Sequence, residues 1–138
     1  IKGGSKISAG AFKHNPTIHN VIIEENVKIG DRAFEGCAEI TNLSLSEGVI
    51  IGRRAFDHCR GITALTIPEG ASIGGGAFAG CTGIRELTLP EGCTFLGGHL
   101  WIAQALQHSP FQKGLVLARG HLRVAEALLR LQLQNNAI

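Results

Sequence analysis

Apolar residues recur every 22 residues along positions 1–98. The clearest column is a phenylalanine that always follows an alanine, and it comprises Phe12, Phe34, Phe56 and Phe78. Aliphatic residues fill further columns, such as Ile18, Ile40, Ile62 and Ile84; Val21, Leu43, Leu65 and Leu87; and Ile7, Ile29, Ile51 and Ile73. Aligned columns at one spacing predict a stack of structural repeats, because one such unit cannot bury its own apolar face.

One side of each repeat reads as a short strand followed by a tight turn. Leu65 and Ile67 alternate with the polar Thr66, which is the period of a strand with one buried face. Pro68–Gly70 follows, and proline and glycine favour successive corners of a turn. We therefore expect the strands of neighbouring coils to form a parallel sheet along one face.

The rest of the repeat returns the chain to the start of the next strand. Ile73-Gly74 begins the return path, and residues 77–81 are expected to close the coil as a short helical or 3₁₀ turn. Ile1 falls in the middle of a strand column, so we expect the chain to be a fragment or a processed product.

Residues 55–74 and 77–98 resemble the BspA-like leucine-rich repeat. Both contain an Ala-Phe pair, a cysteine three residues after the phenylalanine, and a strand that ends in Leu-x-Ile-Pro or Leu-x-Leu-Pro. The first of the two also contains Ile-Gly. The resemblance implies an α/β repeat fold, a right-handed solenoid with short parallel strands on one face. It also implies protein recognition or cell-surface adhesion, and no catalytic residues.

Residues 99–138 depart from the repeat and read as helical, so we divide the chain into a solenoid of about four to five coils (1–98) and a helical C-terminal cap (99–138). Solenoids need such a cap to cover the last coil. An alternative is that Ser109–Phe111 and Gly120–Leu129 resemble a single degenerate ankyrin repeat, although the spacing between them is longer than that family's. In that case the protein is an intracellular scaffold that combines two repeat types.

Composition and charge narrow the possible partners. The 138 residues are 44% hydrophobic and carry a net charge of +2, so a buried core is expected and a basic nucleic-acid-binding stripe is not. No apolar run reaches the ~20 residues of a membrane helix, and we predict no membrane insertion.

Cysteine, histidine and glutamate side chains are the candidate catalytic and metal-binding groups. The cysteines, Cys37, Cys59, Cys81 and Cys93, lack Cys-x-x-Cys spacing and are expected to be buried thiols. Cys93 and His99 could form a nucleophile and base, but no orienting acid is evident. His14 and His58 share a column two coils apart, which is too far for one metal ion. Glu25, Glu47, Glu69 and Glu91 form an exposed ladder without a second acidic column. We predict no enzyme activity, no cofactor and no metal.

The outward strand positions are the predicted partner-binding surface, and they are Asn20, Ile22, Asn42, Ser44, Ala64, Thr66, Glu86 and Thr88. The leading hypothesis is a non-enzymatic module that binds an unidentified protein, and a structural or adhesive spacer is the alternative. Asn42-Leu43-Ser44 also fits the acceptor motif for N-glycans. The compartment stays open, because unpaired cysteines favour a reducing one and the family resemblance favours the cell surface.

Overall fold

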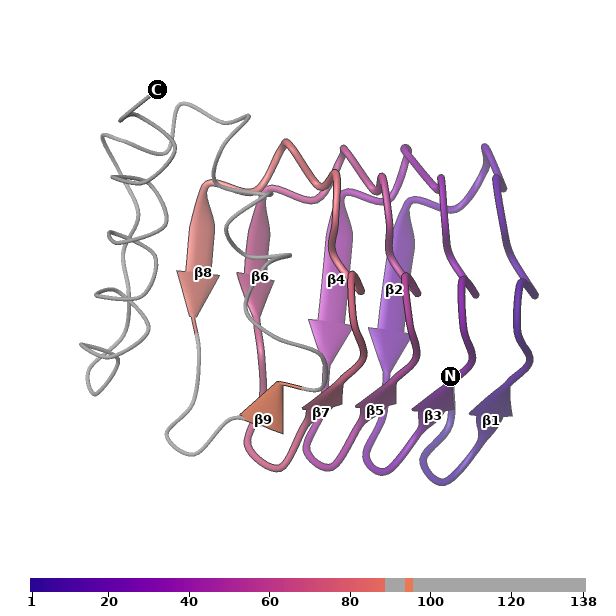
Figure 1. The fold of residues 1–138 in the computed structure, drawn as a ribbon, viewed down its shortest axis with the longest axis vertical. Coiled ribbons are helices and arrows are strands. Elements are labelled where there is room, and N and C mark those ends of the chain that lie inside the picture. Colours follow the sequence, from indigo (N-terminus) through magenta and orange to yellow (C-terminus); the bar gives the residue numbers. More distant parts are fainter. Residues whose placement is uncertain (89–93, 96–138) are drawn as a thin grey trace.

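The computed structural model describes residues 1–88 and 94–95, which wind into a solenoid of parallel β-strands (Figure 1). Four strands lie in a row on one side, namely β2 (Asn20–Ile23), β4 (Asn42–Leu45), β6 (Ala64–Thr66) and β8 (Glu86–Thr88). They form two hydrogen-bonded pairs, β2–β4 and β6–β8. Every pair is parallel and joins residues 22 apart, such as Val21 with Leu43. The predicted parallel strands and their period are therefore confirmed.

A second row of strands lies on the return path, where the sequence predicted no strand. It is a five-stranded parallel sheet built from β1 (Lys6–Ile7), β3 (Lys28–Ile29), β5 (Ile50–Ile51), β7 (Ser72–Ile73) and β9 (Thr94–Phe95). Each strand is two residues long, and β1, β3, β5 and β7 each offer a single inward side chain, such as Ile29 or Ile51. Two residues are too few for a visible alternation, and for this reason the prediction of strands on only one face was incomplete.

The third side of each coil consists of turns, and the predicted helical or 3₁₀ turn is wrong within the described residues. Successive backbone N–H groups alternate between a hydrogen bond within their own coil and a hydrogen bond to the next coil. The N–H groups of Ala33, Glu35 and Cys37 donate three residues back in the chain, and those of Arg32 and Phe34 donate to the next coil, to Arg53 O and Ala55 O. Half of the amides therefore point along the solenoid axis. A continuous helix would direct every amide into its own coil.

The phenylalanine column forms the centre of the core. The rings of Phe34 and Phe56 stack with centroids 5.0 Å apart and an interplanar angle of 2°, and those of Phe56 and Phe78 are 5.3 Å apart. All three rings are at most 1% exposed. Phe12, in the first described coil, stacks on Phe34 but is 37% exposed. Burial of the column therefore requires a coil on each side.

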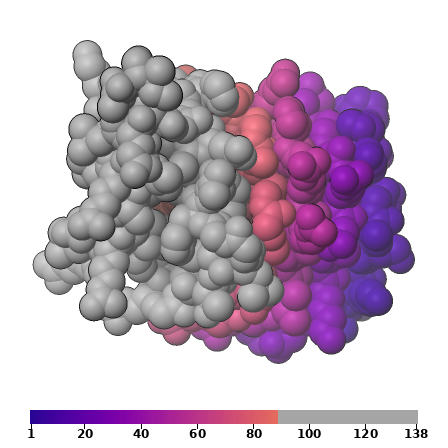
Figure 2. Space-filling view, viewed as in Figure 1, coloured from indigo at the N-terminus to yellow at the C-terminus, as the bar shows by residue number. Residues whose placement is uncertain are grey.

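Successive coils appear as adjoining colour bands from indigo to orange in Figure 2. Each band borders the next, as expected of a quasi-one-dimensional repeat protein. The predicted division at residue 98, the C-terminal helices and the ankyrin-like segment lie outside the described residues.

Candidate functional site

The strand face is the surface made by the outward side chains of β2, β4, β6 and β8. Alternation within each strand turns these side chains to solvent while Val21, Ile23, Leu65 and Leu87 face the core. Seven of the eight predicted partner-binding residues are exposed, and Thr88 is partly buried. The structure therefore places the whole predicted set on one side of the solenoid. The set comprises Asn20, Ile22, Asn42, Ser44, Ala64, Thr66, Glu86 and Thr88.

Strand register brings these residues together in rows along the solenoid axis. Asn20 lies opposite Asn42 and Ile22 opposite Ser44 in one pair of strands. The Nδ2 amide of Asn42 donates to Oδ1 of Asn20 at 2.7 Å, which ties the two side chains into a short amide ladder. Ile22 is 65% exposed beside them. This end of the strand face is uncharged, and it combines amides, a hydroxyl and one large apolar side chain.

The other end of the strand face carries its one charged member. Ala64 pairs with Glu86 and Thr66 with Thr88. Arg85 immediately precedes Glu86 and is also exposed, so opposite charges stand at the same end of the face. Ligand recognition on this surface would rest mainly on hydrogen bonds, since Glu86 is the one charged residue among the eight positions.

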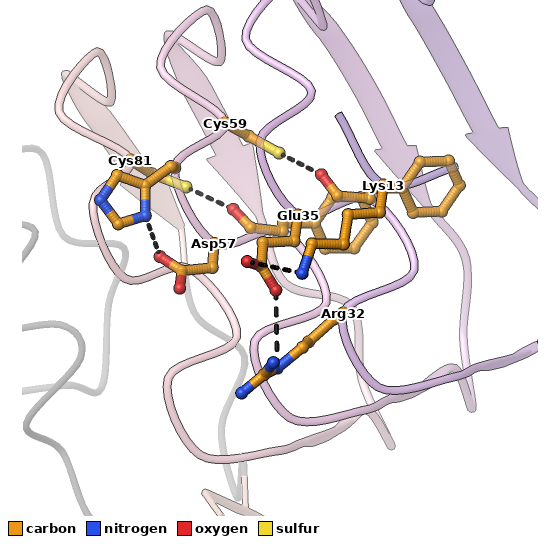
Figure 3. A network of polar contacts seen from close by, with 9 residues as sticks. Lys13, Arg32, Glu35, Asp57, Cys59 and Cys81 are labelled. Carbon is orange, nitrogen blue, oxygen red and sulfur yellow. Dashed lines mark hydrogen bonds and ion pairs between the residues drawn. The ribbon is translucent and has the colours of Figure 1, made fainter. Parts of the chain in front are cut away.

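The described cysteines form a column behind the side of the solenoid that consists of turns, which we call the turn wall. Cys37, Cys59 and Cys81 are free and buried. The Cys59 thiol donates to the carbonyl of Phe34 at 3.1 Å, and the Cys81 thiol to that of Phe56 at 3.0 Å (Figure 3). Burial raises the pKa of Cys81 to about 12 and also raises the pKa of Cys37 and of Cys59. These thiols therefore stay protonated, and the thiolate needed of a nucleophile is suppressed.

A polar network crosses the surface of the same wall, and sequence reasoning did not identify it. Glu35 Oε1 lies 3.3 Å from Nζ of Lys13, and its Oε2 lies 3.5 Å from Nε of Arg32. One coil further, Asp57 is only 5% exposed, and its Oδ1 lies 2.6 Å from Nδ1 of His58 (Figure 3). The column occupied by Lys13, Glu35 and Asp57 changes identity from coil to coil, so the 22-residue repeat gave no signal for it.

The sequence that forms these repeated coils matches one known protein family. Residues 5–116 match the BspA type leucine rich repeat region, in six copies. The chain belongs to this family. No curated protein and no solved structure matches the chain significantly.

Leucine-rich-repeat families, to which this BspA-type solenoid belongs, are typically non-enzymatic. In residues 1–88 and 94–95 no three His, Cys, Asp or Glu side chains are grouped so as to hold a metal ion. The exposed Glu25, Glu47 and Glu69 lie along one corner. Glu91, Cys93 and His99 lie outside the described residues, so the suggested nucleophile pair is not placed.

Two further features bear on partners of the BspA-type solenoid. Arg32, Arg53 and Arg54 are exposed at the turns that follow β3 and β5. Within the part of the chain that the structure describes, no helix has the length and apolar character to span a membrane.

Proposed function

We propose that this chain is a non-enzymatic recognition module, and that a protein partner binds its strand face. Family membership supports an interaction or repeat module in general. The observation that carries the finer proposal is the arrangement of the strand face, because residues 22 apart lie in register within β2–β4 and within β6–β8, and β4 contacts β6 between the two pairs. Such rows present a rigid surface, so little conformational entropy is lost when it is bound.

The choice of residues follows from the chemistry of the face. Ile22, at 65% exposure, offers apolar area, and the amides and hydroxyls of Asn42, Ser44 and Thr66 can pair with the polar groups of a partner. We propose no nucleic-acid partner, since the strand face has no basic side chain among its eight positions.

The test first captures a protein partner by crosslinking and then measures how substitutions on the strand face change its affinity. A photo-crosslinking residue is placed at Thr66 on the strand face, and in a second protein at Ile50 on the outward side of β5, which is 43% exposed. A partner that crosslinks from position 66 and not from position 50 is identified and its dissociation constant measured. Asn42→Arg, Thr66→Arg and Thr88→Arg should each weaken binding at least tenfold, and Ile50→Arg should not. Equal affinity in all four variants would sink the proposal.

A structural or adhesive spacer is the second candidate, and one observation favours it. The strand face has no Trp, Tyr or Arg among its eight positions, and these residues dominate energetic hot spots. A spacer acts through its length and rigidity, so the three arginine variants would leave its activity unchanged while removal of a whole coil would alter it.

We also propose that residues 99–138 form helices that cover the last coil of a right-handed solenoid. The solenoid needs such a cover, and the Ala-Phe pair and the cysteine of the earlier coils are not repeated after residue 98, although the family match continues to residue 116. A chain ended at residue 98 should then unfold at a lower denaturant concentration than the full chain. If the segment is instead the first unit of an ankyrin array in an intracellular scaffold, its stability should rise when further ankyrin repeats are added.

A further inference from the structure

We propose that Asn42 is an acceptor for an N-linked glycan, attached at its side-chain nitrogen Nδ2. This inference goes beyond the proposed function and does not rest on it. A glycan on Asn42 would cover that end of the strand face, so the partner-binding measurements proposed above apply to the unglycosylated chain. Asn42-Leu43-Ser44 meets the acceptor rule, which excludes proline only from the middle position. Asn15-Pro16-Thr17 has the same spacing but is blocked by its proline, and no other asparagine in the chain is followed two residues later by serine or threonine.

The fold presents both essential side chains on the same surface. Asn42 and Ser44 are the two exposed residues of β4, and Leu43 and Leu45 between and after them are partly buried. Alternation in an extended strand turns positions two apart to the same side. The acceptor amide and the hydroxyl therefore both face solvent in the folded protein.

Space around Asn42 suits a bulky substituent. Its register partner is Asn20, and the next coil carries Ala64 at the equivalent position; both are exposed. The side chain of Ala64 is only a methyl group, so it does not obstruct a substituent on the neighbouring Asn42. A glycan there would project into solvent and displace no core side chain.

The existing hydrogen bond survives the modification. Nδ2 of Asn42 donates to Oδ1 of Asn20 at 2.7 Å, and an amide nitrogen carries two hydrogens. A glycosidic bond replaces one of them, and the other continues to donate to Asn20. The amide ladder and the sugar are therefore compatible.

The co-reactant is an oligosaccharide linked through pyrophosphate to a lipid. Nδ2 forms a bond to C1 of the first sugar while the bond from C1 to the pyrophosphate oxygen breaks. The lipid pyrophosphate leaves with the bonding electrons, and one amide proton passes to a base of the transferase. No oxidation or reduction takes place.

The three cysteines that the structure describes are no obstacle to the oxidising compartments in which this transfer occurs. Cys37, Cys59 and Cys81 are all 0% exposed, and their thiols donate to carbonyl oxygens of the previous coil. Burial and hydrogen bonding shield them from disulfide exchange, which requires an accessible thiolate.

The test uses the full chain, preceded by a cleavable secretory leader and followed by an Asn-Leu-Thr tag, and translated with endoplasmic-reticulum microsomes. We expect two glycans, at Asn42 and at the tag, both removed by peptide N-glycosidase. Asn42→Gln and Ser44→Ala should each lose one glycan, Ser44→Thr should keep both, and Asn20→Gln should keep both. Pro16→Ala should gain a third by unblocking Asn15.

Glycan at the tag with none at Asn42 would overturn the proposal, because the tag reports translocation and transferase activity. Loss in Asn42→Gln alone, without loss in Ser44→Ala, would also overturn it. Thr66→Arg should leave the glycan count unchanged, so failure of partner binding and failure of glycan transfer are read separately.

Discussion

The imidazole of His14 occupies the space above Gly36 in which a β-carbon would lie. Both residues have left-handed backbones, with φ of 57° and 73°. They share one column of the repeat with His58 and Gly80, where the same arrangement recurs, and an added β-carbon at Gly80 would lie 2.9 Å from Cδ2 of His58. A histidine in one coil is thus accommodated by a glycine in the next.

Gly36→Ala should lower the free energy of unfolding by about 1–2 kcal/mol for the left-handed backbone, with a further loss because the His14 ring must move. Gly10→Ala is the matched control, since Gly10 has φ of 65° and no atom within 4 Å of an added β-carbon. Urea denaturation of Gly36→Ala, His14→Ala and the double variant should give a favourable coupling between the two changes, of about 0.5 kcal/mol or more. Additive costs would contradict the steric relationship.

Phe56→Ala should destabilise the protein by about 3–5 kcal/mol, because a fully buried phenylalanine is replaced by a cavity between two stacked rings. Phe12→Ala is the control in the same column and should cost much less, since Phe12 is 37% exposed and stacks on one ring only. Guanidinium unfolding followed by circular dichroism measures both. Equal losses would mean that the coil assignment is wrong.

Alkaline pH should destabilise the protein through the buried cysteines. Their pKa is raised above the ordinary 9.0, to about 12 for Cys81, so above pH 9 the unfolded chain releases thiol protons that the folded chain keeps. Stability is therefore complete below pH 9 and falls as the pH rises, by up to about 1.4 kcal/mol per pH unit for each buried thiol. The change is followed as the urea midpoint between pH 7 and 11.

The variant in which Cys37, Cys59 and Cys81 are all alanine is the control for that pH dependence. All other ionisable groups are common to the variant and the parent, so the difference between the two curves reports the thiols. Parallel curves for the variant and the parent would contradict the assignment.

Leu65→Asp and Thr66→Asp should differ sharply although they are neighbours in β6. Leu65 is 1% exposed and faces the core, while Thr66 is exposed on the strand face. A carboxylate at position 65 should prevent folding or cost several kcal/mol, and one at position 66 should change stability by no more than about 0.5 kcal/mol. Thermal unfolding compares the two. The opposite ranking would mean that the strand register is shifted by one residue.

The sequence predicted the long strands well because each repeats the same inward residues. Leu65 and Leu87 keep one column, and the phenylalanines keep another, so register and core followed from spacing alone. The short strands were not predicted from the sequence, because a strand such as β5 has only one inward residue and therefore shows no alternation of its own.

The turn wall and its polar groups were harder to predict for a different reason. The exposed His58 and the buried Asp57 are adjacent in the sequence, and no periodic signal separates them. The left-handed backbone of His14 could have been inferred, because Gly36 and Gly80 occupy the same column and glycine favours that conformation. On the strand face the sequence predicted the exposed positions, and it contained no information on which partner they meet.

Every strand pair joins residues 22 apart, so the chain is built from structural units of 22 residues. Removal of residues 42–63 would join Thr41 to Ala64, place Ala64 opposite Asn20, and leave each remaining core column in phase. Removal of any length other than a whole coil would shift every later column out of line at once. Genes for such a protein can lengthen or shorten by duplication and loss of complete coils, with the reach of the strand face changing one strand at a time.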